Sequence, residues 1–479
     1  MRGNIRTRVS RSGRCAAILA MAFASSWVVP AAGQYPTASF AANPASALAG
    51  SVPNDHPSNE VLGLTLRDAI TRALRYNLAT IESGESARIA RGERLLALSR
   101  LLPQVSAGVS ENVQQLSLAT FGLRGLPGIP NIVGPFSYSS ANVSVSQALF
   151  SLESIQRFRA ARTAEQAAQL SYQDILDAVT LTVGNAYLQV IEADSRIEAQ
   201  EAQVRNAKAL YDQARDEVQA GTAPRIDVTR TEVQLHTEEY SLSVAHNSFQ
   251  TAKLTLGRAI GLPLGQQFEL ANKLPYSDID PINLEDALQT AYKSRKDLRA
   301  ALQYEKTAEL SVSAAKRERY PVLAFNGGYG DVGPTFNHSH QDFTAEVGVR
   351  VPIFTGGRIK GDITQADAVY RQRKAEAENI RGQVDYDVRT AFLNLDAAKE
   401  QVAVAKQNVE LANENLSRSK DRFTTGVTDT VEVVQAEQAL ASANDQYITS
   451  LYNHNLAKLS LARSLGEART NYNQYLGGE

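Results

Sequence analysis

Few side chains in this sequence have the types and spacing of a chemical site. His338 and His340, in the segment NHSH, are spaced like two metal ligands, but a metal site needs three or four ligands and no others lie near them in the sequence. A solvated loop is the favoured interpretation. No phosphate-binding glycine loop, nucleophile elbow or catalytic triad pattern is present. We therefore expect no enzymatic activity, no metal and no cofactor.

Two acidic residues stand in a repeated setting. Asp227 follows Gly221 by six residues, and Glu432 follows Gly426 by the same distance. Such acids either line a narrow passage, where carboxylates favour cations and repel one another, or stabilise the first turn of a helix. Asp429 and Glu432 have the spacing of a capping box, so both interpretations stay open.

The elements that must position these acids are present twice. LTLRDAITRAL at 64–74 corresponds to INLEDALQTAY at 282–292, which lies 218 residues later. LGRAIG at 256–261 corresponds to LARSLG at 461–466, which lies 205 residues later. The sequence therefore predicts a tandem repeat, and each copy has a helix, a strand pair, a very long helix, a turn and a long helix.

Apolar residues recur in the long helical segments at alternating steps of three and four. In the second copy they are Leu395, Ala398, Val402, Ala405, Val409, Ala412 and Leu416. An average spacing of about 3.5 residues predicts a left-handed coiled coil. A helix from residue 155 to 220 would be roughly 100 Å long at about 1.5 Å per residue. An extended structural coiled coil is the simplest interpretation of these helices taken alone.

Residues between the helices alternate in polarity with period two. In DFTAEVGVRVPIF, Glu346 and Arg350 lie on the face opposite the apolar side chains. The predicted strands cover residues 104–118, 137–150, 322–330 and 343–354. They are long enough to cross a bilayer, which takes about 9 to 11 residues per tilted strand. A soluble hairpin packed on the helices is the alternative.

Such strands can lie in lipid only if their sheet forms a closed barrel. Every strand edge in a membrane must be paired, and the smallest closed barrels have about eight strands. Four strands per chain are too few, so several copies would have to pool their strands. Glu346 and Arg350 would then face a shared, water-filled interior.

The N-terminus is typical of an exported protein. Arginines at positions 2, 6, 8, 11 and 14 precede the apolar run CAAILAMAFASSWVVPAAG, which predicts a secretory signal peptide over residues 1–33. The single cysteine, Cys15, would be removed with the signal and is badly placed for lipid attachment. Removing the five arginines from the 49 basic residues leaves 44 against 51 acidic ones, which argues against a nucleic-acid partner.

The remaining boundaries follow from the repeat. A flexible leader is expected because residues 34–63 are rich in Pro, Ala, Ser and Asn. The other predicted segments are repeat 1 over 64–265 with its turn at 220–224, a linker over 266–281, repeat 2 over 282–466 with its turn at 425–429, and a tail over 467–479.

From Leu64 to about Gly466 this arrangement resembles the TolC family of outer membrane channel proteins. The resemblance rests on the duplicated order of elements and on two G-x-x-x-x-x-[DE]-V turns, which begin at Gly221 and Gly426. It implies a mixed α/β membrane protein, mainly α, in which a homotrimer combines four strands per chain into a 12-stranded β-barrel that continues as a periplasmic α-barrel.

The resemblance also implies a function and a location. The protein would be a passive conduit of a tripartite efflux or type I secretion system, in the outer membrane of a Gram-negative bacterium and extending into the periplasm. Its partners would be a periplasmic adaptor, an inner membrane pump and outer membrane lipid. No motif specifies the transported substrate.

Members of this family carry acidic residues at a constricted periplasmic tip, which makes Asp227 and Glu432 gate candidates. The adaptor-contact candidates are the turn residues Gly221, Thr222, Ala223, Gly426, Val427 and Thr428. Glycine at these turns also suits helix C-termini that need a positive φ, and the two roles are compatible. Thr428 stands where some members have an arginine that helps lock the tip, and Arg225 in the other turn is the candidate substitute.

A periplasmic adaptor or a structural coiled-coil scaffold is the competing interpretation, because adaptors are also exported and rich in coiled coil. An adaptor would have one helical hairpin flanked by small β domains. This sequence has two hairpins, each preceded by strands of alternating polarity.

Overall fold

The structure is a computed structural model that describes residues 47–53, 57, 60–121, 130–271, 277 and 282–476. The predicted signal peptide with Cys15, and much of the predicted leader and linker, lie outside the described residues. Within the described part of the chain, no helix combines the length and the apolar composition needed to cross a membrane.

The two repeats contain the same series of elements. Repeat 1 comprises α3 (Leu66–Tyr76), α4 (Leu78–Ser99), β2 (Gln104–Ser117), β3 (Ile132–Phe150), α5 (Leu152–Gln219) and α6 (Arg225–Ala259). Repeat 2 comprises α7 (Leu284–Ser294), α8 (Lys296–Arg317), β5 (Val322–Gly333), β6 (His340–Arg350), α9 (Arg358–Thr424) and α10 (Thr430–Ser464). The predicted fold class, mainly helical with four long strands, is confirmed.

Smaller elements complete the chain. The short strands β1 (Leu62–Leu64) and β4 (Phe268–Leu270) pair in parallel. Two 3₁₀ turns, η1 (Leu118–Phe121) and η2 (Phe336–His338), follow β2 and β5, and α11 (Ala468–Leu476) follows α10.

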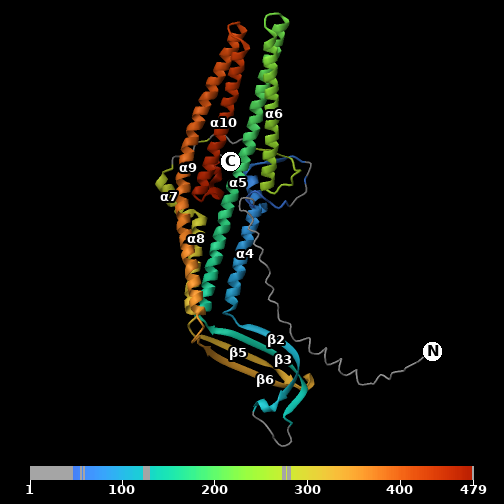
Figure 1. Cartoon of the computed structure of the whole chain (residues 1–479), viewed down its shortest axis with the longest axis vertical. Coiled ribbons are helices and arrows are strands. Elements are labelled where there is room, and N and C mark those ends of the chain that lie inside the picture. Colours follow the sequence, from blue (N-terminus) through green and yellow to red (C-terminus); the bar gives the residue numbers. More distant parts are fainter. Residues whose placement is uncertain are drawn as a thin grey trace, which may run out of the picture. The chain divides into compact units, whose positions relative to one another are not determined.

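The longest helices are α5 with 68 residues and α9 with 67 residues. At about 1.5 Å per residue, each extends roughly 100 Å. Beside the sheet, the packing order is α4, α5, α8, α9, whereas toward the turns it is α6, α5, α10, α9 (Figure 1). The long helices α5 and α9 therefore take part in both sets of packed helices. Along α5, the same side is covered by α4 near the sheet and by α6 near the turns.

Two apolar cores form where the short helices α3 and α7 pack on the long ones. The first core contains Val179, Val183 and Leu256, and the second contains Val384, Val388 and Leu461. Each residue of the second set lies 205 positions after its counterpart. The offset seen in the sequence therefore recurs in the packing. A third core nearer the turns contains Leu210, Leu416, Val433, Ala436 and Leu440.

The long strands form one antiparallel sheet in the order β2-β3-β5-β6. Its register places Val143 between Ala107 and Tyr329, and Tyr329 in turn beside Phe343, so apolar side chains share one face. Phe343 is 77% exposed in the single chain. Ser106, Ser144 and Thr344 fall on the opposite face. The predicted alternation is confirmed.

The end of the last strand differs from the prediction. Strand β6 ends at Arg350, and residues 351–354 lie outside it. Pro352 lacks a backbone N–H and cannot donate to a strand ladder. Periodicity in side-chain polarity continues past the point at which backbone pairing stops.

One terminal prediction was wrong for the part that the structure describes. Ala47 is buried and Leu48 packs against the first core, so this stretch of the predicted flexible leader is ordered. Ser51 forms a bridge with Asn77. The predicted tail contains α11, whose Tyr475 is buried in the second core. Composition predicted a flexible leader but gave no sign of the few apolar side chains that anchor it.

Candidate functional site

The first hairpin turn ends α5 with a left-handed glycine. Gly221 has φ 75°. Its N–H donates to the carbonyl of Val218 at 3.1 Å, and the N–H of Thr222 donates to the carbonyl of Glu217 at 2.9 Å. These two bonds constitute a Schellman motif, which satisfies carbonyls that a helix end leaves without partners.

The second turn repeats the motif at the end of α9. Gly426 has φ 73°, and its N–H donates to Phe423 at 2.9 Å while that of Val427 donates to Arg422 at 2.9 Å. A Cβ on either turn glycine would have no neighbour within 4 Å. The backbone conformation, rather than space, therefore requires glycine at both positions.

The adaptor-contact candidates lie at the surface of the turns. Gly221, Thr222, Gly426 and Val427 are exposed, and Ala223 and Thr428 are partly exposed. Val427 presents 66% of its surface to solvent in the single chain. An exposed aliphatic side chain at the tip of a hairpin is available for contact with another molecule.

The gate candidate Asp227 joins the two hairpins. It is only 8% exposed. Its Oδ1 accepts hydrogen bonds from Thr430 Oγ1 at 2.9 Å and from Arg230 Nη1 at 3.0 Å. Thr430, which is 1% exposed, is the first residue of α10. In the single chain, this carboxylate therefore ties the start of α6 to the start of α10.

The second gate candidate, Glu432, acts within one hairpin. Its Oε1 lies 3.2 Å from Arg422 Nε, and its Oε2 accepts a hydrogen bond from Thr428 Oγ1. Asp429 is the N-cap of α10 and accepts from the N–H of Val431 at 3.1 Å. The cap is thus present at Asp429, while Glu432 extends back to the end of α9. Within the described residues, no hydrogen bond or ion pair brings Glu432 and Asp227 together.

Further polar contacts join α5 to α10. Arg196 lies 3.3 Å from Asp445, and the hydroxyl of Tyr452 donates to Asn185 at 2.6 Å. Sequence reasoning missed these pairs, because partners about 250 residues apart become neighbours only once the relative register of two hairpins is fixed. No local pattern records that register.

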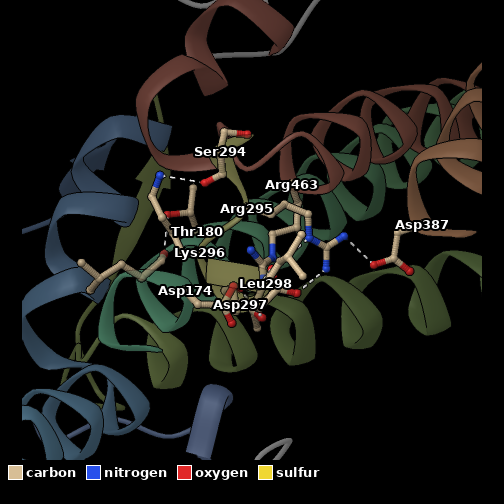
Figure 2. A network of polar contacts seen from close by, with 12 residues as sticks. Asp174, Thr180, Ser294, Arg295, Lys296, Asp297, Leu298, Asp387 and Arg463 are labelled. Carbon is tan, nitrogen blue, oxygen red and sulfur yellow. Dashed lines mark hydrogen bonds and ion pairs between the residues drawn. The ribbon is translucent and has the colours of Figure 1, made fainter. Parts of the chain in front are cut away.

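A buried ionic network lies where α7 meets α8 (Figure 2). The Arg295 side chain is 6% exposed and lies 2.6 Å from both Asp297 and Asp387. Burial disfavours its charge, but its bonds to the two carboxylates raise the pKa of Arg295 overall. Burial acts to raise the pKa of Asp297, yet the bonds from Arg295 hold that pKa below its ordinary value.

The same region contains a second ion pair. Arg463 of α10 donates to Asp174 of α5 at 2.6 Å (Figure 2). Burial raises the pKa of Asp174 despite this pair. Together these ion pairs connect α5, α8, α9 and α10, which is a structural rather than a chemical role.

The lumen candidates lie on the polar face of the sheet. Glu346 is opposite Asn326, and Arg350 is opposite Val322. On the same face, the hydroxyls of Ser106 and Ser144 are 2.7 Å apart, and those of Ser110 and Ser140 are 2.9 Å apart. This face has hydroxyl, amide and charged groups, which suit contact with water.

The two histidines lie in different elements, because His338 ends the 3₁₀ turn η2 and His340 begins strand β6. Nδ1 of His338 lies 3.1 Å from Thr335 Oγ1. Among the described residues, His, Cys, Asp and Glu form no group of three or more that could hold a metal ion.

Comparisons with known proteins match most of the chain. The profile of the family described as Outer membrane efflux protein matches residues 85–262 and 287–467. The chain is 23% identical over 375 residues to Outer membrane protein TolC from Vibrio cholerae, covering 77% of this chain and 83% of that protein. It is 22% identical over 331 residues to Alkaline protease secretion protein AprF from Pseudomonas aeruginosa, covering 66% and 67%.

Solved structures share the fold. The outer membrane protein VceC from Vibrio cholerae superposes with a TM-score of 0.73 at 18% identity, covering 84% of this chain and 96% of that one. The CmeC outer membrane channel from Campylobacter jejuni gives a TM-score of 0.75 at 14% identity, covering 90% and 96%.

Proposed function

The chain belongs to the outer membrane efflux protein family, and from this premise we propose that it forms a passive conduit of a tripartite efflux or type I secretion system. Its place is the outer membrane of a Gram-negative bacterium. Membership decides against the adaptor and scaffold interpretations. Transport through such a conduit makes and breaks no bond, so we propose no enzymatic activity.

The observation that carries the proposal is a sheet with two open edges. Strand β2 has 14 residues and β6 has 11, and within the described residues neither has a partner on its outer side. Each unpaired backbone group in lipid costs several kcal/mol. Four strands are fewer than the roughly eight of the smallest closed barrels. Other copies of the chain must therefore supply the missing partners.

Each of the two sides of the chain consists of an edge strand and one or two outer helices. One side of the chain consists of β2, α4 and α6, and the other consists of β6 and α9. A head-to-tail contact between these two sides repeats around an axis and closes a ring. Three copies would give a 12-stranded barrel and a helical barrel, as the family resemblance implies.

Exposed apolar side chains on the outer helices support this contact. On α6 they are Ile226, Val233, Tyr240, Val244 and Leu254, and on α9 they include Tyr386, Leu393, Val404 and Leu411. Apart from Val244, which follows Tyr240 by four residues, the α6 residues are spaced by multiples of seven, and steps of four and seven both occur in a coiled-coil seam. A seam that is exposed in one chain is suited to a helix of the next copy.

The functional residues have places in this assembly. We propose that Glu346 and Arg350 line the interior of the barrel, since they lie on its polar face. The two turns would contact a periplasmic adaptor, itself coupled to an inner membrane pump. Asp227 and Glu432 would narrow the periplasmic end. For Asp227 this role requires exchange of its bond to Thr430 for contacts near the axis.

Single-channel recording in planar bilayers tests the conduit. Purified protein should give discrete conductance steps, and its mass in detergent should be that of a trimer. Carbonate should leave it in the membrane fraction, whereas an adaptor would be extracted. A stable monomer in detergent that gives no conductance would refute the proposal.

A further inference from the structure

A groove lies at the junction between the sheet and the helices. It has a volume of about 640 Å³ and is formed where α5 begins, α8 ends and α9 begins. Its lining includes Leu152, Ser313, Lys316, Arg319, Tyr320 and Ile363. We call it the junction groove. It combines three cations, Lys316, Arg317 and Arg319, with apolar and aromatic side chains.

Two of the three cations of the junction groove are available for a ligand. Lys316 and Arg319 are exposed, and in the part of the chain that the structure describes neither makes an ion pair or a side-chain hydrogen bond. By contrast, the nearby Arg358 is neutralised by Glu318 and Asp362. A free ammonium and a free guanidinium three residues apart suit a phosphate group.

Further cations lie at the helix ends next to the sheet. Arg100 directly follows α4 and Lys360 is in the first turn of α9, and among the described residues neither makes an ion pair. The acid nearest the start of α5, Glu153, is paired with Arg157 at 2.6 Å. The junction is therefore locally basic, although the chain as a whole has a formal net charge of −2.

The groove lies at the depth of lipid headgroups if the sheet occupies the membrane. Strand β5 begins at Val322, three residues after Arg319. At about 1.5 to 3.3 Å per residue, the backbone distance from Arg319 to the start of the strand is roughly 5 to 10 Å. The headgroup layer on each side of a bilayer is roughly 5 to 8 Å deep.

Exposed apolar side chains also lie in the connections between the helices and the sheet. Ile353 is 96% exposed, Phe354 90%, and Tyr320 and Leu102 49% each. Such side chains are stable at an interface where one end meets acyl chains and the other meets headgroups. In aqueous solvent alone they would be a liability.

We propose that the junction groove binds the headgroup of an anionic phospholipid of the periplasmic leaflet. Lys316 and Arg319 contact the phosphate, while Leu152, Ile363 and Tyr320 contact the glycerol and the first methylenes. The apolar lining favours a lipid over free phosphate, which would use the cations alone. The inference rests on the proposed placement of the sheet in the membrane.

Lipid binding to the purified protein tests this inference. Native mass spectrometry would count bound phosphatidylglycerol and phosphatidylcholine on the full-length protein and on Lys316→Gln/Arg319→Gln. The matched control is Lys208→Gln/Lys406→Gln, which removes two exposed cations from the coiled-coil parts of α5 and α9. A basic residue near an anionic lipid surface contributes about a factor of five, so the junction variant should bind phosphatidylglycerol roughly ten- to thirty-fold more weakly.

The possible outcomes distinguish failure of the proposed lipid site from failure of the proposed conduit function. Equal binding of the two lipids by the wild-type protein would overturn it, as would an equal loss in the junction and control variants. Displacement of the lipid by inorganic phosphate would also overturn it, because it would indicate an anion site only. Conductance is recorded on the same preparations: conducting protein without lipid preference rejects only the lipid site, whereas absence of conductance in every lipid rejects the conduit.

Discussion

Replacing Thr430 with valine tests whether the bond between Asp227 and Thr430 holds the two hairpins together. The substitution keeps the shape of the side chain but removes the hydroxyl that donates to Asp227 at 2.9 Å. Both residues are buried, at 8% and 1% exposure, so water replaces the lost donor poorly. A hydrogen bond to a charged group contributes about 1.5 to 3 kcal/mol.

Part of this loss is compensated by a neighbour. Arg230 still donates to the same oxygen at 3.0 Å, but its side chain is 39% exposed. We therefore expect about 2 kcal/mol per chain, which shifts the equilibrium between joined and separated hairpins by roughly 30-fold. In planar bilayers the open probability of Thr430→Val should rise, and amide hydrogens at the starts of α6 and α10 should exchange faster.

The matched control is Thr430→Ser, which retains the hydroxyl and should behave like the wild type. Similar conductance and exchange in the valine variant and the wild type would refute the reasoning. In that case the bond between Asp227 and Thr430 would not limit separation of the hairpins.

Three other predictions concern the acids, the turns and the ionic network. Asp227→Ala combined with Glu432→Ala should reduce cation preference and divalent block, whereas an unchanged reversal potential would leave both acids only their contacts within the chain. Val427→Asp should abolish crosslinking to the adaptor with trimer yield unchanged, because Val427 is exposed at the turn and needs no positive φ; crosslinking at wild-type levels would exclude the turn from the contact. Arg295→Met leaves two carboxylates without their cation, so thermal unfolding should show a loss of about 3 to 5 kcal/mol. The folded-state pKa of Asp297 is lowered. Its contribution to the free energy of unfolding is therefore complete above the ordinary aspartate pKa and is lost as the pH falls through the lowered pKa. The Arg295→Met variant should lack this decline in stability.

The sequence predicted the features that depend on local pattern. Gly221 and Gly426 mark the turns because a left-handed helix end needs glycine, and the buried residues Ala398, Val402 and Leu416 form part of the predicted seam. Features that depend on distant partners were beyond sequence reasoning. The bond from Thr430 to Asp227 joins residues 203 positions apart. Either residue alone is equally well explained as part of a helix start.

The sheet shows the same division between local and distant information. Alternating polarity predicted the faces of β6, but the strand ends at Arg350, opposite the first residue of its partner β5, and Pro352 has no N–H with which to continue the ladder. A strand ladder depends on backbone hydrogen bonds, and the pattern of polar and apolar side chains does not show which residues lack a backbone N–H.

The even number of long strands per chain has a consequence for closure. Neighbouring strands in β2-β3-β5-β6 are all antiparallel, so the two edge strands run in opposite directions. When β6 of one copy lies beside β2 of the next, the new pair is again antiparallel, whatever the number of copies. An odd number of strands would make every junction between copies parallel.

Within the chain, repeat 1 already meets repeat 2 where β3 pairs with β5 and where α5 packs on α8. The contact between copies would place β2 of repeat 1 against β6 of repeat 2, and α4 or α6 of repeat 1 against α9 of repeat 2. The contact between copies would therefore again join a repeat 1 to a repeat 2, as the contact within each chain does. The chain fixes the direction of this contact, whereas the curvature of the wall determines how many copies close the ring.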